Sequence, residues 1–131
     1  MELAFPWPVS QGEWLAWSSA AVTALFGLVM LLAPRAALRL IRLQPQPDRP
    51  DAIGEVRATL GGFYLGAGLS AILFAQPLIY LGLGLCWALV AFGRFISMLS
   101  DGGNTLRNWV RLVIDAVLGA LALTFALGLV A

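Results

Sequence analysis

Histidine and lysine are absent from this sequence, and cysteine occurs only once. Without histidine, the chain forms no His-based metal site and no His-dependent catalytic triad. The single cysteine, Cys86, lies in an apolar run and has no partner for a disulfide within the chain. We therefore interpret it as a small buried apolar side chain.

Charged residues are scarce as well. They make up 11% of the 131 residues, and apolar residues reach 60%. A soluble domain is about a quarter charged and about half apolar. The net charge of +1 gives no reason to expect a nucleic-acid partner. The composition therefore predicts an integral membrane protein.

Four stretches are apolar enough to cross a membrane, which requires about 20 residues each. They cover residues 14–33, 53–75, 77–99 and 106–130. Ser10 with Glu13 is typical of a capping box, and Pro77 suits a first helical turn. We predict an all-α fold, with residues 1–131 forming a single transmembrane domain, an antiparallel four-helix bundle. Little more than Gln76 separates the second and third spans, which predicts a tight hairpin.

The segment between the first two spans carries a short amphipathic pattern over residues 35–43, "RAALRLIRL". Its arginines, Arg35, Arg39 and Arg42, fall on one helical face, with leucine and isoleucine on the others. This pattern favours an interfacial helix whose arginines meet the anionic headgroups of membrane lipids. A solvated loop is the alternative.

The distribution of arginine predicts the orientation in the membrane. All eight arginines fall in the first loop, the third loop or the adjoining helix ends, and positive loops stay in the cytoplasm. We therefore expect a multi-pass protein of a cell membrane, with both termini outside and the arginine-rich loops cytoplasmic.

Polar residues gather near the cytoplasmic ends of the later spans. We predict a ligand-binding cluster that consists of Glu55, Arg57, Arg94, Asp101, Asn108, Arg111 and Asp115. Charges inside a membrane are costly unless they are paired or hydrated, so we expect Glu55 to pair with Arg94, or else with Arg111. A cluster that merely fixes the register of the helices is the alternative. No metal site is predicted.

Glycines mark two opposite faces of the second span. Gly62 and Gly66 share one face with Thr59 and Ser70, and Gly61 and Gly68 lie on the other. Small residues four apart let a neighbouring helix approach closely. We therefore expect this span to be central in the bundle, with a neighbour on each side and Gly62 and Gly66 in close contact.

Two motifs, "EVRATLGGFYLGAGL" and "FGRFISMLSDG", resemble the domain-of-unknown-function family numbered 4345, over about residues 20–128. The resemblance places the family's signature on Glu55, Arg57, Gly61, Gly62, Gly93, Arg94, Asp101 and Gly102. It implies a small bacterial inner-membrane protein with four transmembrane helices, distantly similar to the DoxX-like group. It implies no established reaction.

These residues bear on three classes of function. No nucleophile–base pair or metal set is evident, and neither are the repeats of a transporter, so an enzyme or transporter is disfavoured. We favour binding of a lipid-like or quinone-like amphiphile at a cytoplasmic-side Arg/acid cluster. The alternative is a non-catalytic accessory subunit of a larger membrane complex. The expected partners are membrane lipids, a membrane protein or a second copy of this chain, with a bound lipid or quinone as the only cofactor-like group.

Overall fold

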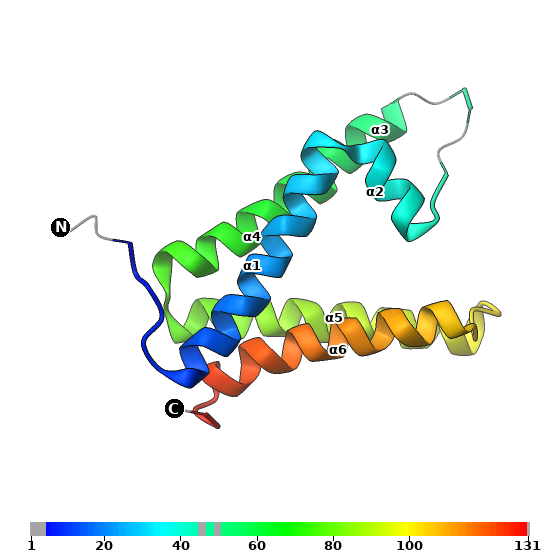
Figure 1. Cartoon of the computed structure of the whole chain (residues 1–131). Coiled ribbons are helices and arrows are strands. Elements are labelled where there is room, and N and C mark those ends of the chain that lie inside the picture. Colours follow the sequence, from blue (N-terminus) through cyan, green and yellow to red (C-terminus); the bar gives the residue numbers. More distant parts are fainter. Residues whose placement is uncertain (1–4, 45–46, 49–50, 131) are drawn as a thin grey trace.

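A computed structural model describes residues 5–44, 47–48 and 51–130, and all of its regular structure is helical (Figure 1). The helices are α1 (Gln11–Leu32), α2 (Pro34–Ile41), α3 (Asp51–Glu55), α4 (Gly61–Phe74), α5 (Pro77–Ser100) and α6 (Leu106–Ala126). A π-helical turn, η1 (Val56–Leu60), joins α3 to α4. Four helical rods are long and apolar enough to cross a membrane: α1, α3–η1–α4, α5 and α6. The predicted all-α, four-span fold is confirmed.

Local signals explain where the helices begin. Ser10 caps α1, since its Oγ accepts the Glu13 backbone N–H at 3.2 Å. Thr105 caps α6 in the same way, by accepting the Asn108 N–H at 3.2 Å. Pro34 and Pro77 lie in the first turns of α2 and α5, where a missing N–H costs no hydrogen bond.

The four rods form two pairs that diverge. α1 packs along α4 and α5 packs along α6, and the pairs lie closest at the end where α1 begins and α6 ends (Figure 1). Toward the other end they separate, and α2 lies between them. We call this second end the open end. The third loop and the end of α1 both lie there.

The prediction that the second span is central was wrong. α1 holds that position, because it packs against α4, α6, α2 and η1. The link between α4 and α5 is short, as predicted, with Ala75 in the left-handed region at φ 51°. The two helices nevertheless diverge after this link, so they do not form a tightly packed hairpin.

Only one of the two glycine faces of α4 contacts another helix, whereas contacts were predicted for both. A Cβ on Gly61 would lie 2.8 Å from the Leu31 backbone nitrogen, and one on Gly68 would lie 2.5 Å from that of Ala24. These glycines therefore permit the close approach of α1 and α4. A Cβ on Gly62 or Gly66 would meet nothing within 4 Å, so neither glycine contacts another helix in the described chain.

The π-helical turn helps to bring one face of this rod onto α1. The buried residues Val56 and Gly61 are five apart, whereas Gly61 and Gly68 are seven apart, about two α-helical turns. In a regular α-helix, five residues rotate about 140° past a full turn, which would point Val56 away from α1. A π turn accommodates the extra residue, so both Val56 and Gly61 are buried.

Candidate functional site

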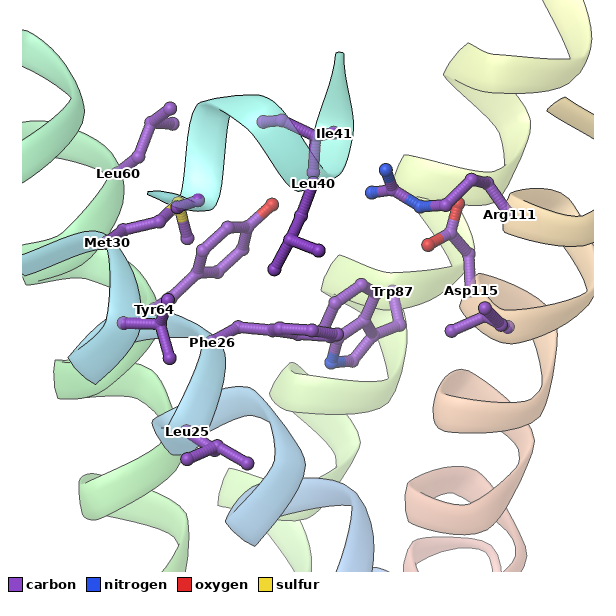
Figure 2. Close-up of a pocket in the computed structure, with 13 residues that line it drawn as sticks. Leu25, Phe26, Met30, Leu40, Ile41, Leu60, Tyr64, Trp87, Arg111 and Asp115 are labelled. Carbon is purple, nitrogen blue, oxygen red and sulfur yellow. The ribbon is translucent and has the colours of Figure 1, made fainter. Parts of the chain in front are cut away.

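A cavity of about 370 Å³ lies between the two helix pairs toward the open end. We call it the inter-pair cavity. Thirteen residues from α1, α2, η1, α4, α5 and α6 line it, and ten of them are apolar apart from the indole nitrogen of Trp87. Figure 2 shows Met30 and Tyr64 on one side, Arg111 with Asp115 on the other, and Leu40 between them.

Aromatic side chains form one wall of the cavity. The rings of Tyr64 and Trp87 stack with their centroids 5.9 Å apart and their planes only 4° from parallel. The ring of Phe26 lies 6.3 Å from that of Trp87 (Figure 2). Stacked aromatic rings present a flat apolar surface with few rotatable bonds, so this wall is rigid.

A chain of buried hydrogen bonds fixes the position of Trp87. Its Nε1–H donates to the Thr23 hydroxyl at 2.8 Å, and Thr23 donates to the Ser19 carbonyl at 2.8 Å. The Ser19 hydroxyl in turn donates to the Leu118 carbonyl at 2.7 Å. These bonds connect α5, α1 and α6, so the two helix pairs are linked by polar contacts as well as by apolar packing.

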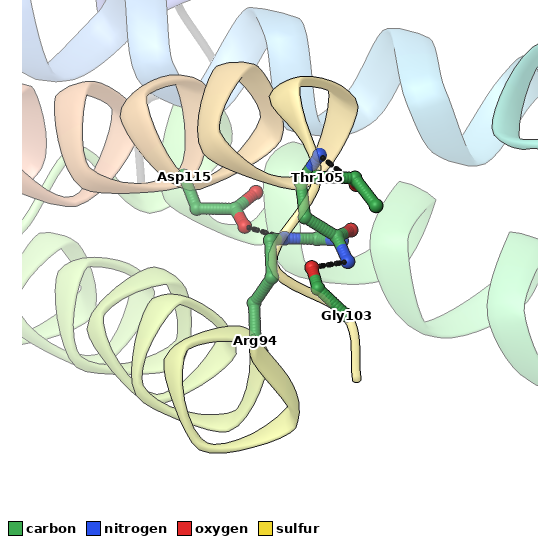
Figure 3. Close-up of polar contacts among 5 residues, drawn as sticks. Arg94, Gly103, Thr105 and Asp115 are labelled. Atoms are coloured by element: carbon green, nitrogen blue, oxygen red, sulfur yellow. Dashed lines mark hydrogen bonds and ion pairs between the residues drawn. The ribbon is translucent and has the colours of Figure 1, made fainter. Parts of the chain in front are cut away.

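The polar end of the cavity is built around Asp115. This carboxylate is only 1% exposed, and its Oδ2 accepts the Arg94 Nε–H at 2.7 Å (Figure 3). Arg94 reaches it from α5, so the ion pair joins the two helices of one pair. A buried carboxylate needs such a partner, because its desolvation is otherwise uncompensated.

Arg111 lies one helical turn before Asp115 and also lines the cavity (Figure 2). The Arg94–Asp115 pair is the one ion pair within 4.0 Å among the residues that the structure describes. Arg111 is therefore not salt-bridged to any described carboxylate. With two guanidinium groups and one carboxylate, the Arg94–Asp115–Arg111 cluster carries a net charge of +1.

Helix α2 covers the cavity from the open end. Ala37, Leu40 and Ile41 contribute to the lining, and the Arg107 guanidinium on α6 donates a hydrogen bond to the Leu40 carbonyl. The two arginines of α2, Arg35 and Arg39, are exposed. The predicted amphipathic helix is present, with an apolar face turned toward the bundle.

Four of the seven predicted site residues lie outside the cluster. Glu55 is exposed and accepts the Thr59 hydroxyl at 3.0 Å, and Arg57 is exposed on the π turn. Asp101 is exposed at the end of α5. The Asn108 amide donates to the Gly103 carbonyl at 2.8 Å and so closes the third loop.

The predicted pairing of Glu55 with an arginine was wrong. Asp115, rather than Glu55, pairs with Arg94, because α5 packs on α6 along its length. The rod that carries Glu55 diverges from these helices toward the open end (Figure 1). The structure brings together Arg94, Arg111 and Asp115, and it leaves Glu55 on the surface.

Sequence reasoning missed Tyr64 and Trp87 as site residues. A signal was present, because Trp87 lies in the middle of a span, whereas tryptophan in membrane proteins prefers the interfaces. A tryptophan at that depth needs a hydrogen-bond acceptor for its indole N–H, here Thr23. Among the described residues, no three His, Cys, Asp or Glu side chains converge as metal ligands would.

The chain belongs to the family described as Domain of unknown function (DUF4345), whose match covers residues 12–126. The suspected family resemblance is thereby confirmed. No match was found among curated proteins or among solved structures.

Proposed function

We propose that this protein binds a lipid-like or quinone-like amphiphile in the inter-pair cavity. The observation that carries the proposal is the composition of the cavity: apolar and aromatic walls with a charged cluster at one end. Ligand sites are typically concave, mostly apolar and equipped with a few convergent polar groups. An amphiphile has the same two parts, and the surrounding membrane would supply it.

The charged cluster would receive the headgroup and the walls would receive the tail. Arg111 and the Tyr64 hydroxyl offer hydrogen-bond donors, and Arg94 holds Asp115 in place. In a bacterial inner membrane with the arginine-rich loops in the cytoplasm, the cavity would open at the cytoplasmic leaflet. No reaction is part of this proposal.

The proposal is tested by blocking the cavity. Ile114 lines it, and Ile114→Trp should fill part of its volume. The control is Ile96→Trp, because Ile96 is similarly exposed but does not line the cavity. Mass spectrometry after gentle solubilisation should find an amphiphile bound to the parent and to the control, and much less on the blocked variant. Equal amounts on all three would contradict the proposal.

A role as an accessory subunit remains the second candidate. The face of α4 that carries Gly62 and Gly66 meets nothing in the described chain, and small residues on such a face permit the close approach of another helix. Copurification of a protein in fixed stoichiometry, lost in a Gly66→Leu variant that still folds, would favour this function over the first.

A further inference from the structure

The charge balance of the inter-pair cavity distinguishes between classes of amphiphile. Arg94 neutralises Asp115 at 2.7 Å, and no described carboxylate lies within 4.0 Å of Arg111. The positive charge that faces the cavity is therefore that of Arg111. A neutral headgroup would leave this charge without a counter-ion.

An uncompensated charge is costly at this place. Arg111 lies about 7.5 Å along α6 from its start, at 1.5 Å per residue, on a helix apolar enough to cross a membrane. Charged side chains inside membrane spans pair with opposite charges or face a hydrated cavity. A ligand carboxylate would supply the missing charge, and its two oxygens match the planar fork of a guanidinium.

The size of the cavity limits the tail. Ligand cavities usually span about 300–1,000 Å³, and this one, at about 370 Å³, is near the lower end. It therefore suits one chain better than the two chains of a phospholipid. The flat surface of Tyr64 and Trp87 would lie against that chain.

We propose that the inter-pair cavity selects a single-chain amphiphile with one negative charge, a fatty-acid-type carboxylate, and that Arg111 is the residue that pairs with its headgroup. One negative charge balances the net charge of +1 on Arg94, Asp115 and Arg111. This inference rests on the proposed function and narrows it, because it disfavours neutral quinones. Asp115 acts as a positioning residue that keeps Arg94 away from the ligand.

Quenching of tryptophan fluorescence provides the test, because Trp87 lines the cavity. The full chain is placed in nanodiscs of zwitterionic lipid at a pH where the acid is ionised. The probes are a fatty acid brominated in mid-chain, its methyl ester, an alkyl phosphate of equal length and a long-tailed neutral quinone. We expect the acid to bind about tenfold more tightly than the ester, as a charge-assisted hydrogen bond allows.

Variants of the arginines show whether the preference belongs to the cavity. Arg111→Gln should bring the acid and the ester to about equal affinity, and Arg111→Lys should retain most of the preference because it keeps the charge. Arg57→Gln serves as the control. It removes the same charge from an exposed residue of the π turn that does not line the cavity.

The outcomes separate this inference from the proposed function. If the ester or the quinone binds the parent as tightly as the acid, the charge selection is overturned and amphiphile binding stands. If the alkyl phosphate binds more tightly than the acid, the assignment to a carboxylate is overturned. If no probe quenches specifically, the proposed function fails as well. An acid preference that survives Arg111→Gln would remove Arg111 from its assigned role.

Discussion

Among the residues that the structure describes, Asp115 is the one charged residue that is almost completely buried. Its exposed fraction is 1%. Its partner, Arg94, retains 20% exposure and can be hydrated. The two ends of the pair are therefore unequal. Removing the arginine leaves a carboxylate unpaired inside the bundle, whereas removing the carboxylate leaves an arginine that can still reach water.

This inequality gives the first prediction. Arg94→Gln should cost about 3–5 kcal/mol of stability, because it leaves a buried charge unpaired. Asp115→Asn should cost less, and the double variant should recover part of the loss. Unfolding in detergent measures all three. The control is Glu55→Gln, on an exposed residue, which should change stability by less than about 0.5 kcal/mol. Strictly additive losses for Arg94 and Asp115 would show that the two are not coupled.

The hydroxyl of Thr23 gives the second prediction. Thr23→Val keeps the shape of the side chain but leaves the Trp87 indole N–H buried without an acceptor. We expect a loss of about 1–3 kcal/mol, the usual cost of an unsatisfied buried donor. Thr124→Val is the matched control, since the Thr124 hydroxyl bonds only within its own helix, to the Leu121 carbonyl. Equal effects of the two variants would mean that the bond to Trp87 adds nothing.

From the sequence, the placement of one residue relative to another could be predicted only when both lie on the same helix. The spacing of Arg111 and Asp115 placed them on the same face of α6, because four residues make about one turn. The partner of Arg94 depends on which helix lies opposite, and that is set by packing among all four rods. Glu55 and Asp115 are equally good partners by charge, and only the pairing of α5 with α6 decides between them.

At the scale of whole elements, the rod from Asp51 to Phe74 departs most from the prediction. A uniform period of 3.6 residues put Gly62 and Gly66 on a contact face. All four glycines lie in the regular helix α4, where Gly61 and Gly68 face α1 and the other two meet nothing. The π turn η1 at Val56–Leu60 changes the rotation of the preceding residues, such as Val56, relative to this face. The amino-acid composition of "VRATL", residues 56–60, does not indicate a π turn.

The π turn leads to the third prediction. Deleting exposed Ala58 would leave Val56 and Gly61 four residues apart, a spacing that a regular α-helix buries on one face. The deletion should therefore leave the bundle about as stable as the parent. Deleting exposed Ala67 from the middle of α4 is the control. It rotates everything before it by about 100° relative to α1 and should unfold the protein in a thermal scan. This account of η1 would be contradicted if the Ala58 deletion unfolded the bundle and the Ala67 deletion did not.

The two glycine faces of α4 give the fourth prediction. Gly68→Leu should cost at least about 1–3 kcal/mol, because the Ala24 backbone leaves no room for a side chain. Gly66→Leu should be tolerated by the isolated protein, since nothing lies within 4 Å of the added Cβ. Thermal unfolding in detergent compares the two. A strong loss with Gly66→Leu in monomeric protein would show that this face has a partner within the chain.

At the scale of the whole molecule, the cavity results from an angle between helix pairs that no local pattern specifies. Each rod could be found from its length and hydropathy. Their divergence depends on contacts at the end opposite the open end and on α2 at the open end. At the former end, one core cluster buries Ala16, Ala20, Ala71 and Ala122. The inter-pair cavity, and with it the role of Tyr64, therefore could not be predicted from the sequence.

The orientation in the membrane gives the last prediction. The arginines lie in the first loop or in the helix ends that adjoin the first and third loops, and both loops lie at the open end of the molecule, so all of the arginines are on the same side (Figure 1). Because positive loops stay in the cytoplasm, the open end should face inward and the start of α1 outward. Cys86 is exposed on α5 rather than buried as predicted, so it is first replaced by serine. In this Cys86→Ser background, a membrane-impermeant maleimide should label Val9→Cys in intact cells. Asn104→Cys should react only after the cells are permeabilised. The reverse pattern would turn the cavity mouth toward the outer leaflet, and its ligand would then have to come from that side.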